Sequence, residues 1–159
     1  MPKPQLKRSA GILLFRRAVS GIEVLLAHPG GPFWKNKDEG AWSIPKGEYG
    51  DDEDPLAAAK REFAEETGLT PLGEFIPLGE VRQARGKIVS VWAVEGDFDT
   101  RNLRSNTFTI PWPPKSGKLQ EFPEMDRAEW FSLEIARRKI LKGQAEVLER
   151  LTQYLRDVA

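Results

Sequence analysis

Three glutamates, Glu62, Glu65 and Glu66, are spaced to lie on one face of a helix. Residues three and four positions apart on a helix are neighbours, so the three carboxylates would project within a single turn, where they repel one another. A hard divalent cation would offset that repulsion, and carboxylate oxygens suit Mg²⁺ or Mn²⁺. An acidic, solvated helix face is the alternative. We favour the metal site because Arg61 directly precedes the cluster and Glu53 lies upstream of it.

The helix that carries these carboxylates is predicted to run from Pro55 to Thr67. Asp54 is suited to cap its free N–H groups, and proline suits the first helical position. Gly68 ends the helix, because glycine tolerates the left-handed conformation common just past a helix end. The stripe next to the carboxylates is apolar and is expected to face the core: Leu56, Ala59 and Phe63.

Residues 47–69 as a whole resemble the signature of the Nudix hydrolases. That signature reads Gly, five residues, Glu, seven residues, Arg-Glu, a bulky apolar residue, any residue, Glu-Glu, any residue, Gly and an apolar residue. All seven fixed positions agree, and the chain is identified as a member of the family. Phe63 fills the apolar position where Ile, Leu or Val is usual, a difference that concerns packing rather than chemistry.

The resemblance implies a loop-helix-loop that binds Mg²⁺ or Mn²⁺. Water would attack a phosphorus of a nucleoside diphosphate linked to another group, X, and break a pyrophosphate bond. By matched position, the metal ligands would be the carboxylates of Glu62, Glu65 and Glu66 and the carbonyl of Gly47.

Several further residues would assist the reaction. Glu53 would bind metal or pair with Arg61, and Arg61 would orient the carboxylates. Glu65 is the first choice for the general base, and Glu121 or Glu124, in the loop before the last helices, is the alternative.

The rest of the chain is similar to the diadenosine tetraphosphate hydrolase branch of the family in several short segments. These are Ser9–Arg17 (SAGILLFRR), Trp42–Gly47 (WSIPKG), Gly86–Lys87 before Val91–Val94 (VWAV), and Glu129–Phe131 (EWF). The resemblance implies a dinucleoside polyphosphate substrate, hydrolysed to ATP and AMP. Rival substrates are a nucleoside triphosphate, ADP-ribose or another sugar nucleotide, and the 5′ end of RNA. A non-catalytic nucleotide sensor is a remote alternative, because such proteins usually have a damaged acidic cluster.

Substrate contacts are expected outside the acidic cluster. Lys46 would point toward phosphates, with Lys87 and Arg82 farther along a polyphosphate chain, although each could equally be an ordinary surface cation. Aromatic residues in loops could stack on a base, and the candidates are Phe33, Trp34 and Trp112. Core packing is expected for the tryptophans in strands, Trp42, Trp92 and Trp130, and a structural role is expected for His28.

Composition limits the remaining possibilities. The length of 159 residues predicts a single domain, residues 1–159. The 24 basic and 24 acidic residues cancel, so no overall field attracts RNA or a membrane. There is no cysteine, and we found neither a signal segment nor a transmembrane run, so we expect a cytoplasmic protein. Both monomer and homodimer stay open.

The order of elements predicts an α/β class protein: the Nudix fold, an α/β/α sandwich around a mixed β-sheet. Strands are expected at residues 9–17, 21–28, 41–45, 75–83, 87–94 and 127–131, with C-terminal helices over about 133–158, as Leu133–Leu141 and Gln144–Val158. A long proline-rich loop is predicted over Asn102–Glu121.

Overall fold

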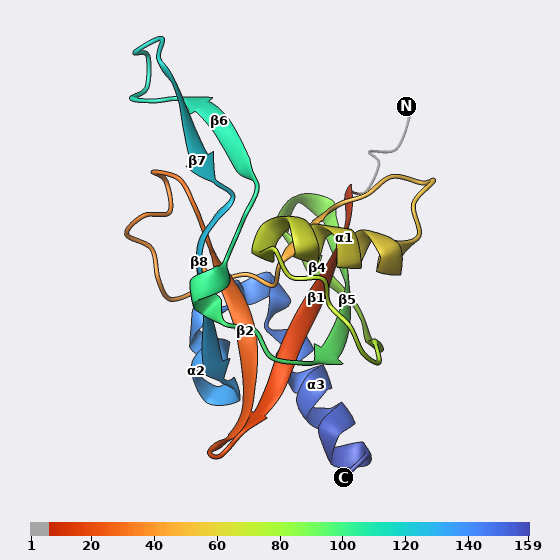
Figure 1. Cartoon of the computed structure of the whole chain (residues 1–159). Coiled ribbons are helices and arrows are strands. Elements are labelled where there is room, and N and C mark those ends of the chain that lie inside the picture. Colours follow the sequence, from red (N-terminus) through yellow and green to blue (C-terminus); the bar gives the residue numbers. More distant parts are fainter. Residues whose placement is uncertain (1–6) are drawn as a thin grey trace.

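The computed structural model describes residues 7–159, which form a mixed sheet between layers of helices (Figure 1). Its strand order is β4-β5-β1-β2-β8, and β3 pairs with the N-terminal half of β1. Among the strand pairs of this sheet within residues 7–159, β1–β5 is the one parallel pair. The strands are β1 (Lys7–Ala18), β2 (Gly21–Pro29), β3 (Lys46–Glu48), β4 (Ile76–Gln83), β5 (Lys87–Glu95) and β8 (Met125–Ser132).

Helix α1 (Pro55–Thr67) covers one face of the sheet, whereas α2 (Leu133–Lys139) and α3 (Glu146–Asp157) pack on the other. Successive residues of β1 point to opposite faces, as the strand pleat requires. Ile12 and Leu14 join the core beneath α1, and Leu13 and Phe15 join the core beneath α3. The predicted α/β/α sandwich is therefore confirmed. The part of the chain that the structure describes has no helix of membrane-spanning length and apolarity.

The bounds of α1 agree with the predicted helix. The Asp54 side chain accepts a hydrogen bond from the Ala57 N–H at 3.0 Å, and Gly68 ends the helix at a φ of 84°. Ala59 and Phe63 are fully buried against the sheet. Local sequence signals thus fix the helix that carries the three glutamates.

Residues 41–45 do not form the predicted strand. Ser43 pairs with Ala27 and Trp42 bridges to Ile140, each as an isolated bridge, and the strand begins only at Lys46. The segment is apolar because it is buried, not because it lies in a ladder. Its backbone bonds go to different elements, and Pro45 has no N–H to offer.

The predicted loop over residues 102–121 is also wrong. It contains β6 (Thr107–Pro111), which pairs with β7 (Leu119–Pro123) as a separate two-stranded sheet. We call residues 107–123 the arm. The arm projects from the body beyond the end of β8 (Figure 1). Phe108 and Phe122 pair across it with ring centres 6.0 Å apart. The C-terminal helices lie within their predicted ranges, but α2 ends at Lys139 and α3 begins at Glu146.

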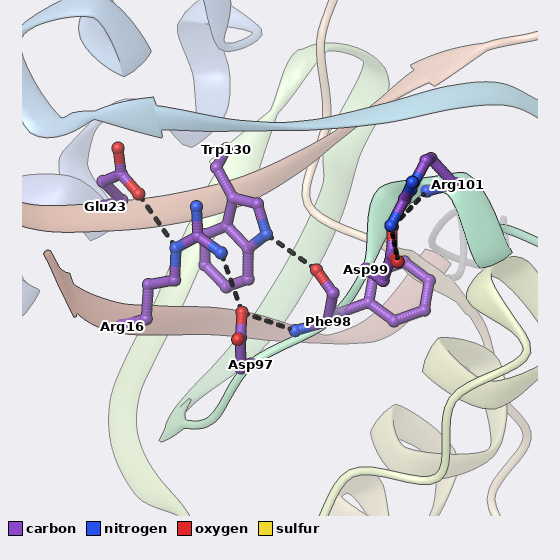
Figure 2. A network of polar contacts seen from close by, with 7 residues as sticks. All are labelled: Arg16, Glu23, Asp97, Phe98, Asp99, Arg101 and Trp130. Atoms are coloured by element: carbon purple, nitrogen blue, oxygen red, sulfur yellow. Dashed lines mark hydrogen bonds and ion pairs between the residues drawn. The ribbon is translucent and has the colours of Figure 1, made fainter.

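A polar network fixes the β1–β2 hairpin to the segment after β5 (Figure 2). Arg16 donates to Glu23 at 2.8 Å and to Asp97 at 2.7 Å, and its guanidinium lies 4.1 Å from the ring centre of Trp130. The Trp130 indole donates to the Phe98 carbonyl at 2.9 Å. Trp130 therefore packs in part on a cation and not only in the core.

Candidate active site

A cavity of about 520 Å³ lies where β3, α1 and the base of the arm meet. Its lining is dominated by carboxylates, with a single cationic side chain, Lys46. The sequence-predicted residues that it brings together are Lys46, Gly47, Glu62, Glu65, Glu66 and Glu124. Glu48 and Asn106 complete the lining. The wall made by β3 and α1 is called the acidic wall below.

Arg61 organises the acidic wall. Its Nε and Nη2 donate to the two carboxylate oxygens of Glu53, each at 2.8 Å. Its Nη1 donates to Glu62 at 2.8 Å and lies 3.3 Å from a Glu65 oxygen. The hydrogen bond with Glu53, and to a lesser extent that with Glu62, raises the pKa of Arg61 above its usual range. The bond between Arg61 and Glu53 also lowers the pKa of Glu53. The guanidinium thus bridges the loop before α1 and the carboxylates on it.

Glu66 differs from the other two glutamates because it is only 8% exposed. Burial raises its pKa to about 8, against the opposing effect of a hydrogen bond accepted from the Lys46 N–H at 3.1 Å. Burial also raises the pKa of Glu62 and lowers that of Lys46. The interior of the wall therefore disfavours charge unless a further cation compensates for it.

Gly47 lies directly against the Glu62 carboxylate. A Cβ at this position would overlap the carboxylate atoms, so a larger residue here would displace the Glu62 carboxylate from its place against β3. This close approach places the Gly47 main chain and the glutamates in the same cavity.

The donor set fits a hard divalent ion. It consists of oxygen atoms, and the buried carboxyl of Glu66 would gain its charge in the presence of a cation. Within residues 7–159, however, no three His, Cys, Asp or Glu side chains are already spaced to hold an ion. Arg61 Nη1 donates to Oε1 of Glu62 alone, so Oε2 of Glu62 could bind an ion without breaking that bond, whereas Glu65, with both oxygens within 3.4 Å of Nη1, would have to turn from Arg61 to do so.

Other sequence-predicted residues lie outside the cavity lining. Arg82 is exposed on β4, one of the two edge strands of the main sheet order. Lys87 begins β5 and is near enough to contribute to the lowered pKa of Lys46. Glu121 is exposed on β7, and is thus placed apart from Glu124, the other alternative for the general base.

Two of the three aromatic candidates contact each other. Phe33, in the segment after β2, packs edge-on against Trp112 of the arm, with ring centres 5.4 Å apart and planes at 79°. The residue Phe33 is 66% exposed and is therefore accessible to a ligand. Trp34 is also partly exposed, whereas Trp42 is buried as predicted.

Asn106 was not anticipated from the sequence. Its N–H donates to the Glu65 carbonyl at 2.9 Å, and its carbonyl accepts from the Glu124 N–H at 2.7 Å. It therefore joins the arm to the last turn of α1. No motif signals this role, since it depends on contacts between segments far apart in the sequence.

Solved structures share this fold across almost the whole chain. The Ap4A hydrolase of C. elegans, in a binary complex, is 24% identical over 96% of this chain and 99% of that chain, with a TM-score of 0.61. The NUDIX domain of Shewanella oneidensis NrtR, complexed with ADP ribose, is 20% identical over 96% and 90%, with a TM-score of 0.66. A MutT protein from Methanosarcina mazei Go1 is 21% identical over 98% of both chains, with a TM-score of 0.62.

No curated protein sequence matches the chain. The family model of the NUDIX domain matches residues 5–151, which include the acidic wall, the arm and the whole sheet. The chain therefore belongs to the NUDIX family and is a pyrophosphohydrolase of that family.

Proposed function

We propose that this enzyme hydrolyses a dinucleoside polyphosphate, converting diadenosine tetraphosphate and water to ATP and AMP, with Mg²⁺ or Mn²⁺ as its metal ion. The observation that supports this most is the acidic cavity together with a separate aromatic pair on the arm and the loop after β2. In a long substrate with several phosphates and a base at each end, the phosphates would suit a metal ion in the cavity and a base would suit the aromatic pair. The short segments similar to diadenosine tetraphosphate hydrolases point the same way.

The acidic wall would hold the metal through Glu62, Glu65, Glu66 and the Gly47 carbonyl. A bound divalent ion would neutralise phosphate charge and lower the pKa of a coordinated water. Arg61 would keep the carboxylates oriented through its bonds to Glu53 and Glu62.

Proton transfer and phosphate binding fall to neighbouring residues. Glu65, or Glu124 across the cavity, would accept the proton of the attacking water while the phosphorus–oxygen bond to the leaving phosphate breaks. Lys46 would donate to a phosphoryl oxygen, and Lys87 and Arg82 would meet phosphates farther along the chain. Phe33 and Trp112 would stack on a base.

Product analysis tests this proposal. The purified protein is incubated with Mg²⁺ and, separately, diadenosine tetraphosphate, ADP-ribose, NADH, nucleoside triphosphates and 5′-triphosphate RNA. ATP plus AMP from the dinucleotide, at the highest kcat/KM of the panel, is the expected result. Faster turnover of another compound would replace the substrate and keep the chemistry. Nucleotide binding without turnover, with Mn²⁺ also tried, would favour the sensor alternative.

A further inference from the structure

His28, at the end of β2, is fully buried, and both of its ring nitrogens have partners. Nε2 lies 2.7 Å from the carbonyl oxygen of Lys37, and Nδ1 lies 2.9 Å from Oδ1 of Asp126 in β8. A carbonyl oxygen can only accept, so Nε2 carries a proton and donates it to Lys37. A second proton must lie between Nδ1 and the Asp126 carboxylate, on one atom or the other.

The surroundings of Asp126 decide where that proton lies. The Asp126 side chain is 34% exposed, and Oδ1 is 3.8 Å from Nε of Arg127. Water and a neighbouring cation thus both lie beside this carboxylate, and a carboxylate in its ionised form is only an acceptor, so Nδ1 must donate to it. We propose that His28 is a buried imidazolium, paired with Asp126, that positions the loop of residues 30–40 for substrate binding.

His28 is connected to further charged groups through Trp42. Trp42 lies edge-on to the imidazole with ring centres 5.1 Å apart, and the Arg127 guanidinium lies 5.1 Å from the Trp42 ring centre. Asp38 accepts from the Trp42 indole at 2.9 Å and from Lys139 of α2 at 2.6 Å. Besides His28, the charged groups of this network are thus Asp126 and Arg127, and, on the other side of Trp42, Asp38 and Lys139.

The loop that His28 holds carries Phe33. One end of it is fixed by the Gly30 N–H, which donates to the Glu124 carbonyl at 2.9 Å. The other end is fixed to α2 through Asp38. The bond from His28 to the Lys37 carbonyl holds the chain between these two points. His28 touches no substrate in this account. It is a positioning residue, and its link to binding rests on the proposed function through Phe33.

Imidazole nitrogen NMR on the full chain, labelled with ¹⁵N-histidine, tests the charge state directly because His28 is the only histidine. At about pH 7, both nitrogens should have the shifts of protonated nitrogens. In Asp126→Asn the amide can donate to Nδ1, so only Nε2 should stay protonated. A single protonated nitrogen in the wild type would overturn the proposal.

Loop release supplies a second readout. In Asp126→Asn the neutral imidazole keeps its Nε2–H bond to the Lys37 carbonyl, but that bond loses its charge assistance and is weaker. This variant should therefore speed tryptic cleavage after Lys35 or Lys37 about tenfold, and should raise KM for diadenosine tetraphosphate about tenfold with kcat changed little. Asp99→Asn, which removes an exposed carboxylate paired with Arg101, is the matched control and should change neither. Unchanged cleavage and KM in Asp126→Asn would overturn the positioning role. If the wild type does not hydrolyse diadenosine tetraphosphate, the substrate proposal fails. The NMR and cleavage results then still decide the role of His28.

Discussion

Two regions of the molecule are held in place differently. One is the acidic wall, and the other is the arm with the loop after β2 that the arm contacts. The acidic wall comes from one continuous stretch, β3 to α1, and its side chains are fixed by Arg61 and by burial of Glu66. The arm is a two-stranded sheet, an element that is marginally stable alone. It depends on its base, where Asn106 joins α1, and on contact with the loop after β2.

This difference suggests that the two regions have different roles in the reaction. The residues proposed to cleave the diphosphate come from one continuous, rigid stretch of chain. The residues proposed to bind the rest of the substrate come from segments that are far apart in the sequence. Changes in the acidic wall should therefore act mainly on kcat, and changes in the arm should act mainly on KM.

The largest effect is expected from Glu66→Gln, which should lower kcat/KM by roughly 10²–10³-fold because the site loses a charged ligand. The fold should be unaffected, since glutamine resembles the protonated carboxyl that burial favours when no cation is present. Steady-state kinetics with Mg²⁺ and circular dichroism check both points. Wild-type turnover by this variant would remove Glu66 from the metal site.

Arg61→Lys should cost about 10- to 100-fold in kcat, because an ammonium cannot bond both oxygens of Glu53 and also reach Glu62. Arg101→Lys, at an exposed pair with Asp99, is the matched control and should have wild-type kinetics. A rise in KM with kcat unchanged would instead mean that Arg61 contacts substrate, and would remove the difference expected between the acidic wall and the arm.

Trp112→Ala should raise KM by about five- to a hundredfold, since stacking on a base is worth about 1–3 kcal/mol. The value of kcat should change little. Leu119→Ala, an exposed apolar residue on the same arm, serves as the control. If KM is unchanged in Trp112→Ala, the arm does not hold the base.

The smallest effect concerns stability as a function of pH. The pKa of Glu66 is about 8 in the folded state against 4.5 for an ordinary glutamate, so between these values the folded state binds the extra proton. Without metal, stability should therefore fall as pH rises from about 5 to 8, and metal should stabilise the protein more at the upper end.

Thermal unfolding of the wild type and Glu66→Gln, with and without MgCl₂, isolates this contribution as the difference between the two proteins. If the stability of the wild type and of Glu66→Gln changed with pH in the same way, Glu66 would have the pKa of an ordinary glutamate.

The two regions also differ in how far the sequence predicts them. Helix α1 could be predicted because Asp54 and Gly68 fix its ends locally. The arm could not, because Pro111, Pro113 and Pro114 suggested a loop, whereas the strands on either side of that turn pair through Phe108 and Phe122.

Residues 41–45 were mistaken for a strand because burial, not pairing, makes them apolar. The same limit applies within the cavity. Asn106 reaches it through contacts with Glu65 and Glu124, which no local pattern encodes. Non-local contacts are thus what sequence reasoning lacked in both regions.

The most direct test that the acidic wall is the metal site is a titration with Mn²⁺. Binding is measured as the decrease of the EPR signal of the free ion. Wild type and Trp112→Ala should bind Mn²⁺ equally, and Glu66→Gln should bind it at least about tenfold more weakly. Equal Mn²⁺ affinity in Glu66→Gln and the wild type would contradict the account.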